Sequence, residues 1–557
     1  MTGRLFAALL VLTLAFRFWL AAAFPITGDE AYFIWWGWKP DWGFYDHPPL
    51  IGWWLAALLQ FGDAEWWLRL PVILQPALLA LAVYGALPRL VAGIGEERRL
   101  WAATLVLLAP VNVWNVFITT DTPLIYCSVL SGLAWIRASR DDAPRWYLAA
   151  GLLLAGAVLS KYFAAILGFA YLVDVLRRRT PGAWAGLAIA YACTLPALAL
   201  MAWWNSANCW PNYMFNFVNR HGDAGWSIKT PLLYAVTLIY VLGPPVLWLA
   251  WRNRRLVGPA SAGRGGWRCR ADFSRPGGDG VVGPASAGQG GWRTEVRPTS
   301  APQSARTPDP RSAPRSALPQ TALTTLAWLP FLLFAILALV KQIGLHWLLS
   351  FVPFALIWLT LRLAPASLNR LGLFFVGFAT LHIAAILIVS RVPLETWQKT
   401  RLYDGIVLTF EHRALARELE PYRKEWVLAM DGYSNAVTLG YNLRQYVVVF
   451  GEASSHARHD DLVTDFRALA GRDFLILRKS APNLDDYRKY FREVGADSFE
   501  IRGARFWRVK GQGFDYAAYR EGVLAGVRRK YYAIPAWLPQ TACYMCDRYF
   551  PGEACRR

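Results

Sequence analysis

The chain has 557 residues, 55% of them hydrophobic, and it carries 29 Trp. Soluble domains are typically about 45–50% apolar, so this excess indicates a protein that is partly solvated by lipid. A net charge of +20 would suit nucleic-acid binding if it covered a soluble surface. The basic residues instead recur in alternate loops between apolar runs, which excludes a nucleic-acid partner.

About eleven apolar runs are long enough to be interpreted as membrane spans. They cover residues 5–24, 67–92, 101–119, 121–138, 146–159, 161–176, 183–204, 231–251, 323–340, 345–363 and 369–390. The first run is interpreted as an uncleaved helix rather than a secretory signal, because it exceeds a usual signal core and Arg17 interrupts it. The predicted fold class is mainly α, a polytopic transmembrane bundle followed by a small external α/β domain.

The arginines predict the orientation of this bundle. If Arg4 is cytoplasmic, the loops on its side contain the clusters at 89–99, 137–145, 177–179 and 362–370. The opposite short loops hold only scattered cations, which is the pattern of the positive-inside rule. We therefore expect a bacterial inner-membrane protein whose first loop, residues 25–66, faces the periplasm or exterior.

Composition divides the chain into four regions. Residues 1–251 form an N-terminal transmembrane region, and residues 323–390 add three further spans. Between them, residues 252–322 are rich in Gly, Pro, Ser, Ala and Arg and contain the near-duplicates GPASAGRGGWR and GPASAGQGGWR. This composition is typical of a disordered loop, here cytoplasmic and without a catalytic role.

Residues 391–557 are predicted to form the external α/β domain. WVLAMD at 426–431, YVVVF at 446–450 and DFLILR at 473–478 indicate short buried strands, alternating with helices at 409–420 and 459–470. Cys543, Cys546 and Cys555 follow near the C-terminus. A disulfide among them fits an external location, whereas a zinc site needs a fourth ligand that is not found nearby in the sequence.

Ionisable residues gather on the predicted external side. The first loop contributes Asp29, Glu30, Asp46 and His47, and later loops contribute Asp121, Lys161, Arg220, His221, Lys341 and His346. Charges at membrane depth are costly and usually line a functional cavity. Carboxylates supply a general base and cations hold a departing phosphate, so the set suits group transfer from a lipid phosphate donor. It would equally suit a proton-coupled transporter.

The motifs at these positions resemble a known family. GDEAYFIWWGW followed by GFYDHPPLIGWWL is similar to membrane glycosyltransferases of the GT-C class. The resemblance is to the dolichyl-phosphate-mannose protein mannosyltransferase-like family, which includes bacterial aminoarabinose transferases of lipid A modification. LRLP at 68–71, TTDTPL at 119–124, LSKYF at 159–163, FNFVNRHG at 215–222 and KQIGLHWLLSFVP at 341–353 follow in the family's order.

The resemblance implies an inverting transfer of a sugar from a polyprenyl-phosphate donor to a lipid, glycan or protein acceptor. Asp29 matches the family's general base, although it could instead be the N-cap of a helix that starts at Glu30. Glu30 is assigned to the catalytic pair, where it either orients Asp29 or caps the helix.

The resemblance also implies a phosphate and metal region. Asp46 matches a position near a divalent metal or the donor phosphate, and His221 lies where related enzymes have a metal-binding histidine. Relatives have Glu-Lys where this chain has Asp46-His47, so His47 contacts phosphate or ligates metal. Arg220 suits a phosphate contact. A divalent metal ion is therefore a candidate cofactor.

Two lysines and one aspartate complete the predicted site. Lys161 and Lys341 are candidate donor-phosphate contacts, with snorkelling to the interface as the alternative. Asp121 is predicted to position a loop or a lysine, or else to cap the helix ahead of Pro123. The rival function is a transporter or flippase of polyprenyl-linked glycans. That function predicts inverted repeats and charges at mid-membrane, and the sequence shows neither.

Overall fold

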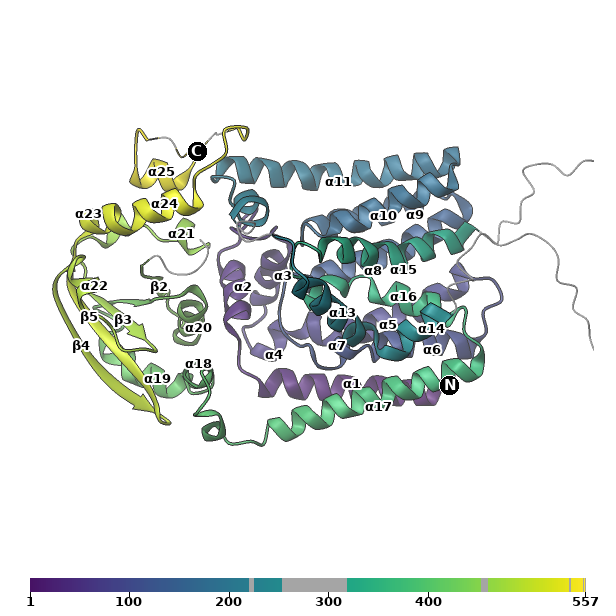
Figure 1. Cartoon of the computed structure of the whole chain (residues 1–557), viewed down its shortest axis with the longest axis horizontal. Helices are drawn as coiled ribbons and strands as arrows, with labels where there is room; N and C mark the ends of the chain where they lie inside the picture. Colours follow the sequence, from purple (N-terminus) through teal and green to yellow (C-terminus); the bar gives the residue numbers. More distant parts are fainter. Residues whose placement is uncertain (220–224, 253–317, 452–458, 540–541, 554, 556–557) are drawn as a thin grey trace, which may run out of the picture.

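The computed structural model describes residues 1–219, 225–252, 318–451, 459–539, 542–553 and 555 (Figure 1). Its N-terminal region contains α1 (Gly3–Ala23), α2 (Gly28–Trp38), α3 (Leu50–Leu59), α4 (Glu65–Leu68), α5 (Leu70–Leu90), α6 (Glu96–Leu107), α7 (Pro110–Trp114), α8 (Asp121–Asp141), α9 (Pro144–Val158), α10 (Ala164–Arg178), α11 (Pro181–Ala207), α12 (Pro211–Tyr213), the π-helix η1 (Met214–Val218), α13 (Lys229–Leu242) and α14 (Pro244–Arg252). The second transmembrane region contains α15 (Leu318–Leu337), the 3₁₀ helix η5 (Leu345–Leu348), α16 (Val352–Thr360) and α17 (Pro365–Val389).

Each predicted apolar run lies on one helix or on two consecutive helices. By length and composition, four helical segments of the described chain can cross a membrane alone: Gly3–Ala23, Glu65–Leu90, Pro181–Ala207 and Pro365–Val389. The pair α13 and α14 is a fifth candidate, bent by 95° where Gly243 separates the two helices. The run 101–119 is divided between α6 and α7. The protein is therefore multi-pass, and the count of about eleven spans stays a prediction.

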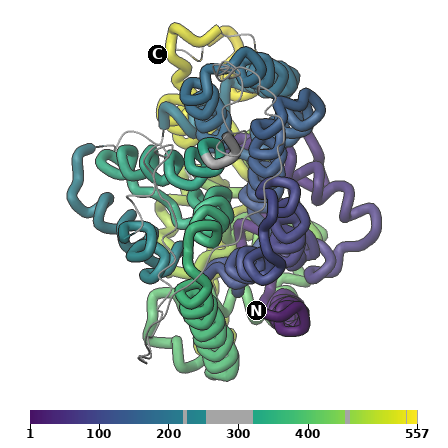
Figure 2. The backbone as a smooth tube through the Cα atoms, turned by 90° about the vertical axis from the view of Figure 1, so that its right-hand side faces the viewer, coloured from purple at the N-terminus to yellow at the C-terminus, as the bar shows by residue number. Residues whose placement is uncertain are grey.

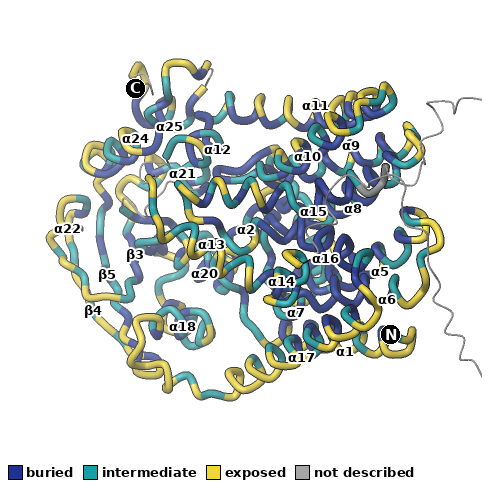
Figure 3. The backbone as a smooth tube through the Cα atoms, turned by 45° about the vertical axis from the view of Figure 1, so that its right-hand side comes forward, coloured by how far each residue is buried: buried dark blue, intermediate teal, exposed yellow. Residues whose placement is uncertain are grey.

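The outer surface of the bundle is apolar, as lipid contact requires. α1, α11 and α17 lie along the sides of the bundle and carry long exposed stretches (Figure 3). The exposed side chains on these helices include Leu12, Leu195, Leu373 and Ile388, at 61–72% exposure. In water such surfaces would associate, whereas lipid tails solvate them without cost.

Arg17 lies inside the bundle and is only 1% exposed. Its guanidinium donates to the carbonyls of Val72, Ile73, Asn112 and Asn115. Carbonyls that end helices or lie in breaks can accept such bonds, so the arginine joins α1 to α5 and to the irregular segment around α7.

The C-terminal domain is a mixed five-stranded sheet with helices on its bundle-facing side, placed at one end of the bundle (Figure 1). Its strands are β1 (Val427–Met430), β2 (Val448–Val449), β3 (Phe474–Arg478), β4 (Phe491–Ile501) and β5 (Ala504–Phe514), in the order β2-β1-β3-β5-β4. Its helices are η6 (Leu394–Trp397), α18 (Tyr403–Phe410), α19 (His412–Leu419), η7 (Glu420–Tyr422), α20 (Tyr433–Leu443), α21 (Asp460–Val463), η8 (Phe466–Leu469), α22 (Asp485–Arg488), α23 (Tyr516–Tyr519), η9 (Arg520–Leu524), α24 (Ala525–Tyr531) and α25 (Tyr544–Tyr549).

The three predicted strands coincide with β1, β2 and β3, and β1 pairs in parallel with both of the others. The predicted helix 409–420 is divided between α18 and α19, and the segment 459–470 is divided between α21 and η8. The long antiparallel hairpin β4–β5 was not predicted. Its turn is Arg502-Gly503, with φ of 49° and 77°. Two positive φ angles define a type I′ hairpin turn, and the Gly at the second position was its local signal.

The predicted loop 252–322 lies almost entirely outside the described residues. Its two ends are helical, because α14 includes Arg252 and α15 already begins at Leu318, five residues before the predicted span.

The sheet domain and the bundle share two apolar clusters. One cluster combines Tyr45 and Cys209 of the transmembrane region with the aromatic core of the sheet, and the other combines α2 with Tyr441 of α20. Figure 1 shows α2, α3 and α4 between the bundle and α20, and Figure 2 views the assembly along the bundle. The first loop is therefore enclosed between the two parts rather than exposed on an open surface.

Candidate active site

Helix α2 begins the site, and its N-terminus is held by a buried ion pair. Thr27 is the N-cap, and its backbone N–H and hydroxyl donate to Glu30 at 3.0 and 3.1 Å, a capping box. Both side chains of the Glu30–Arg69 pair are fully buried, with Arg69 donating to the two carboxylate oxygens at 2.8 and 2.7 Å. The Ile118 N–H donates to the same carboxylate at 3.0 Å. Of the two roles considered for Glu30, the structure shows the cap.

Asp29 is exposed at the second position of α2. The alternative of Asp29 as N-cap is wrong, because the helix begins at Gly28 and Thr27 occupies the capping position. The Oδ1 atom of Asp29 accepts a hydrogen bond from Tyr433 Oη at 3.1 Å. Tyr433 is the first residue of α20 in the sheet domain. The Asp29 carboxylate is therefore not the helix cap, and it lies exposed in the first turn of α2 beside α20.

Asp46, in the loop after α2, contacts Tyr32, which lies one helical turn beyond Asp29. Asp29 and Tyr32 are three residues apart on α2, and Tyr32 Oη donates to Asp46 Oδ1 at 3.3 Å. The His459 backbone N–H in turn donates to Tyr32 Oη at 3.0 Å. The side chain of Asp46 is 3% exposed, and its backbone carbonyl accepts from Asn216 at 3.1 Å.

His459, just before α21, closes the other side of this loop. Its Nδ1 accepts from the Tyr45 N–H at 3.4 Å, and its ring packs edge-on against Phe44 at 5.1 Å. Burial lowers the pKa of His459 to about 4, and the opposing charge of Asp46 is the smaller effect. The imidazole is therefore neutral at neutral pH, as an acceptor of a backbone N–H must be.

A second polar group joins the ends of three segments. Lys161 Nζ contacts both Asp121 oxygens at 2.9 Å, and both side chains are less than a tenth exposed. His346 Nε2 lies 4.0 Å from the same carboxylate. The Leu50 N–H, three residues after His47, donates to the Leu159 carbonyl at 2.9 Å, two residues before Lys161. Asp121 thus holds a lysine, one of the two roles predicted for it, and the DHPP segment lies beside this pair.

The remaining predicted contacts are less completely placed. Lys341 is half-buried in the turn that follows α15. It precedes by five residues His346, which lies near Asp121. Arg220 and His221 lie outside the described residues. Their predicted roles in phosphate and metal binding stay predictions.

The described residues do not assemble a metal site around Asp46. The one described group of three potential ligands consists of Cys543, Cys546 and Cys555. Asp46 belongs to no such group among the described residues, and its predicted partner His221 lies outside them, so a metal at Asp46 stays a prediction.

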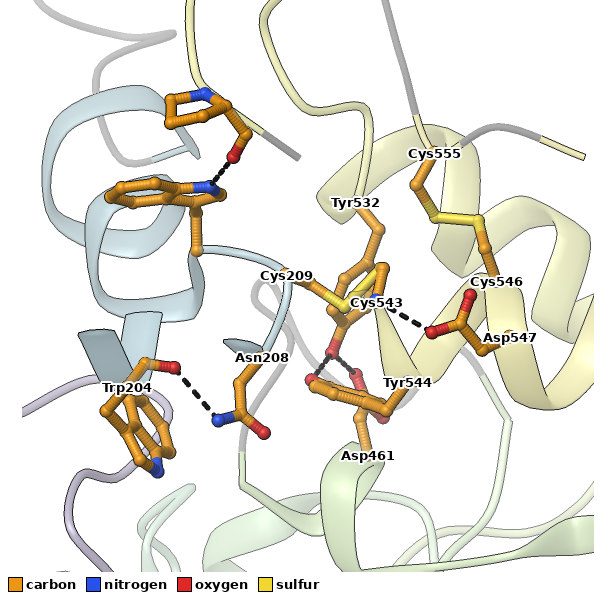
Figure 4. The surroundings of a disulfide bond; sticks show 12 residues. Trp204, Asn208, Cys209, Asp461, Tyr532, Cys543, Tyr544, Cys546, Asp547 and Cys555 are labelled. Carbon is orange, nitrogen blue, oxygen red and sulfur yellow. Dashed lines mark hydrogen bonds between the residues drawn. A yellow bond between two sulfur atoms is a disulfide. The ribbon is translucent and has the colours of Figure 1, made fainter. Parts of the chain in front are cut away.

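The C-terminal tail contains two disulfides, one internal and one that joins it to the bundle (Figure 4). Cys546 pairs with Cys555, which is the predicted bond among the three tail cysteines. The third, Cys543, pairs with Cys209 at the end of α11, 334 residues earlier. The partner of Cys543 is therefore a distant cysteine, Cys209, which the local sequence around the tail does not contain. Disulfides persist in oxidising compartments, which agrees with an external location for this domain.

Below these disulfides lies a buried acid and two phenols (Figure 4). Tyr532 Oη donates to Asp461 at 2.8 Å and contacts Tyr544 Oη at 2.6 Å. Burial, and then the charge of Asp460, raises the pKa of Asp461 well above its usual value.

Sequence reasoning missed the residues that the sheet domain contributes. Tyr433 and His459 lie more than 400 positions from their partners in the first loop, and no local pattern marks either. Arg69 had a signal, since LRLP is one of the matched motifs, but its pairing with Glu30 is a tertiary contact.

Solved structures with the same fold define the class of protein. ArnT from Cupriavidus metallidurans in the apo state superposes with a TM-score of 0.58 at 15% identity, over 90% of this chain and 97% of that chain. The same protein bound to undecaprenyl phosphate gives a TM-score of 0.57 at 15% identity, over 91% of this chain and 98% of that one. The chain therefore has the fold of the GT-C membrane glycosyltransferases.

The sequence comparisons agree with the resemblance that the motifs show. Residues 46–204 match the model of the family described as dolichyl-phosphate-mannose-protein mannosyltransferase, the family that the motifs resemble. The lipid A galacturonosyltransferase RgtD of Rhizobium johnstonii is 27% identical over 247 residues, which are 41% of this chain and 49% of the relative. The chain thus aligns with about half the length of this curated relative.

Proposed function

We propose that the protein transfers a sugar from a polyprenyl-phosphate donor to lipid A on the outer face of the bacterial inner membrane. The observation that carries the proposal is the exposed Asp29 carboxylate in the first turn of α2. Tyr32, one turn further along α2, contacts Asp46. The loop of Asp46 continues to Leu50, which bonds Leu159 near the Lys161–Asp121 pair. A base and a cation at the same end of a lipid-solvated bundle suit a donor with a prenyl tail. The acceptor class follows from the likeness to RgtD.

The reaction is a single displacement. Asp29 accepts the proton of the acceptor hydroxyl as its oxygen forms a bond to the anomeric carbon of the sugar. The bond from that carbon to the phosphate oxygen breaks, and the polyprenyl phosphate leaves with its electron pair. Attack opposite the leaving group inverts the anomeric configuration.

Lys161 is the described cation best placed to hold the leaving phosphate. An ammonium has three N–H donors, and Asp121 engages Nζ through two contacts, so a third donor is left for a phosphate oxygen. Asp121 holds the lysine in place before substrate arrives. His47 and Lys341 extend the same role, together with Arg220.

The test uses full-length protein purified in detergent, with radiolabelled undecaprenyl-phosphate sugars as donors and lipid A as acceptor. Asp29→Asn is expected to lower kcat by about 10²–10⁴-fold, the usual contribution of a general base. Asp41→Asn is the matched control, an acid of the same loop whose side chain accepts from the adjacent Trp42 N–H. A wild-type protein that transfers no sugar from any donor contradicts the function. Full activity of Asp29→Asn contradicts the mechanism.

A further inference from the structure

The sheet domain contacts the proposed base itself. Tyr433 Oη donates to Asp29 Oδ1 at 3.1 Å, and its ring packs edge-on against Tyr32 at 5.5 Å. Tyr32 is the residue whose hydroxyl bonds Asp46. Tyr433 therefore contacts Asp29 through its hydroxyl, and its ring packs on Tyr32, whose hydroxyl bonds Asp46.

The position of Tyr433 depends on close packing between α20 and α2. A Cβ atom at Gly28 would lie 3.0 Å from the Ser434 carbonyl oxygen and closer still to its side chain, so only glycine permits this approach. Further along, Trp38 stacks on Tyr441 at 5.9 Å between ring centroids. Beyond the helix end, Arg444 pairs with Asp63 at 2.9 Å.

These contacts limit the freedom of the Tyr433 ring. Aromatic pairs favour edge-on and offset-stacked arrangements such as these, and the glycine contact sets the distance between the two helix starts. The phenol is thus presented to Asp29 by a rigid element rather than by a loose loop.

A phenol bound to one carboxylate oxygen has a definite chemical effect. It restricts rotation of the Asp29 carboxylate and leaves Oδ2 to receive the proton of the acceptor. The donor is neutral, so it orients the base without supplying the full charge that would abolish its basicity. A contact that served docking alone could use any exposed polar atom of α2, whereas this one is made to the proposed base.

We infer that Tyr433 is a positioning residue for Asp29, so that the C-terminal sheet domain completes the active site in addition to any part in acceptor binding. This inference rests on the proposed function. The hydrogen bond holds the base at the angle needed for proton transfer, and its loss lowers the rate of transfer without weakening donor binding.

The experiment compares Tyr433→Phe with Tyr441→Phe in the full-length protein. Both changes remove one hydroxyl from α20 and keep the ring, and Tyr441 stacks on Trp38 away from Asp29. Tyr433→Phe is expected to lower kcat by about 10- to 100-fold, the range for a lost hydrogen bond to a charged group, with unchanged donor KM. Tyr441→Phe is expected to keep the wild-type kcat. Thermal unfolding in detergent checks that the two variants are equally stable.

A double-mutant cycle separates positioning from a general structural effect. If Tyr433 acts through Asp29, adding Tyr433→Phe to Asp29→Asn causes little further loss of rate. If the two losses multiply, or if Tyr433→Phe alone retains the wild-type kcat, the inference is wrong while the proposed function stands. An inactive wild type or a fully active Asp29→Asn defeats the proposed function or mechanism instead, so the two failures are distinguishable.

Discussion

Replacing Glu30 should unfold the protein rather than only inactivate it. Its carboxylate accepts from Arg69, from Thr27 and from the Ile118 N–H, and both members of the ion pair are fully buried. Glu30→Gln removes the charge that compensates the Arg69 guanidinium. Arg69 keeps its bonds to the carbonyls of Ala21, Phe24 and Pro25 but loses its counter-ion.

Breaking a buried pair by removing one partner costs about 3–5 kcal/mol. Gln can still complete the capping box, because its amide oxygen accepts from the Thr27 N–H as the carboxylate does. The loss of the ion pair alone is a large share of the total stability of many domains, about 5–15 kcal/mol. We therefore expect Glu30→Gln to lower the thermal midpoint strongly and to reduce the yield of folded protein.

Asp29→Asn is the matched variant, since the neighbouring Asp29 carboxylate is exposed and accepts a hydrogen bond from Tyr433. Exposed substitutions usually change stability by about 0.5 kcal/mol or less. The assay measures thermal unfolding in detergent and kcat on the folded fraction. A Glu30→Gln protein with the wild-type midpoint and a kcat as low as that of Asp29→Asn would refute the structural assignment of Glu30.

Three further predictions concern other parts of the site and its supports. Lys161→Met leaves Asp121 buried without its ion pair, so we expect a lower midpoint together with a raised donor KM, whereas a variant with normal KM would argue against a phosphate contact. The pKa of His459 is lowered from 6.5 to about 4, so the unfolded chain binds the proton more readily between these values. Native stability then falls by roughly 3 kcal/mol as the pH drops from 6.5 through 4, and His459→Gln should flatten that part of a stability–pH profile. Cys209→Ser opens the bond to Cys543, and we expect about 2–4 kcal/mol of lost stability in oxidising buffer but no loss relative to wild type in dithiothreitol.

Local patterns were sufficient for the apolar helices and for three of the five strands. Apolar runs predicted the helices because a lipid-solvated helix must be apolar over most of its length, and that property is readable in one segment. The strands β1, β2 and β3 were predicted for the similar reason that each is a short run buried on both faces. The hairpin β4–β5 was missed because most of its residues are not buried, so no apolar alternation marks it. Its Arg502-Gly503 turn was the one local signal.

The site divides in the same way. Asp29, Asp46, Asp121 and Lys161 were predicted from motifs, because the chemistry of base and phosphate contact restricts residue type at each position. Their partners were not predictable, since a hydrogen bond from Tyr433 to Asp29 joins positions 404 residues apart. Glu30 shows the limit most clearly, because its motif favoured catalysis or capping alike and only the burial of Arg69 against it decided for the cap.

The sequence by itself determined that the chain is a lipid-solvated bundle with acids and cations gathered at one side, because hydropathy and residue type are local properties. Only the tertiary structure decided that the Asp29 carboxylate is exposed and the Glu30 carboxylate is buried. That outcome depends on how α2, α5 and α20 approach one another, since burial pairs Glu30 with Arg69 and leaves Asp29 at the surface beside Tyr433.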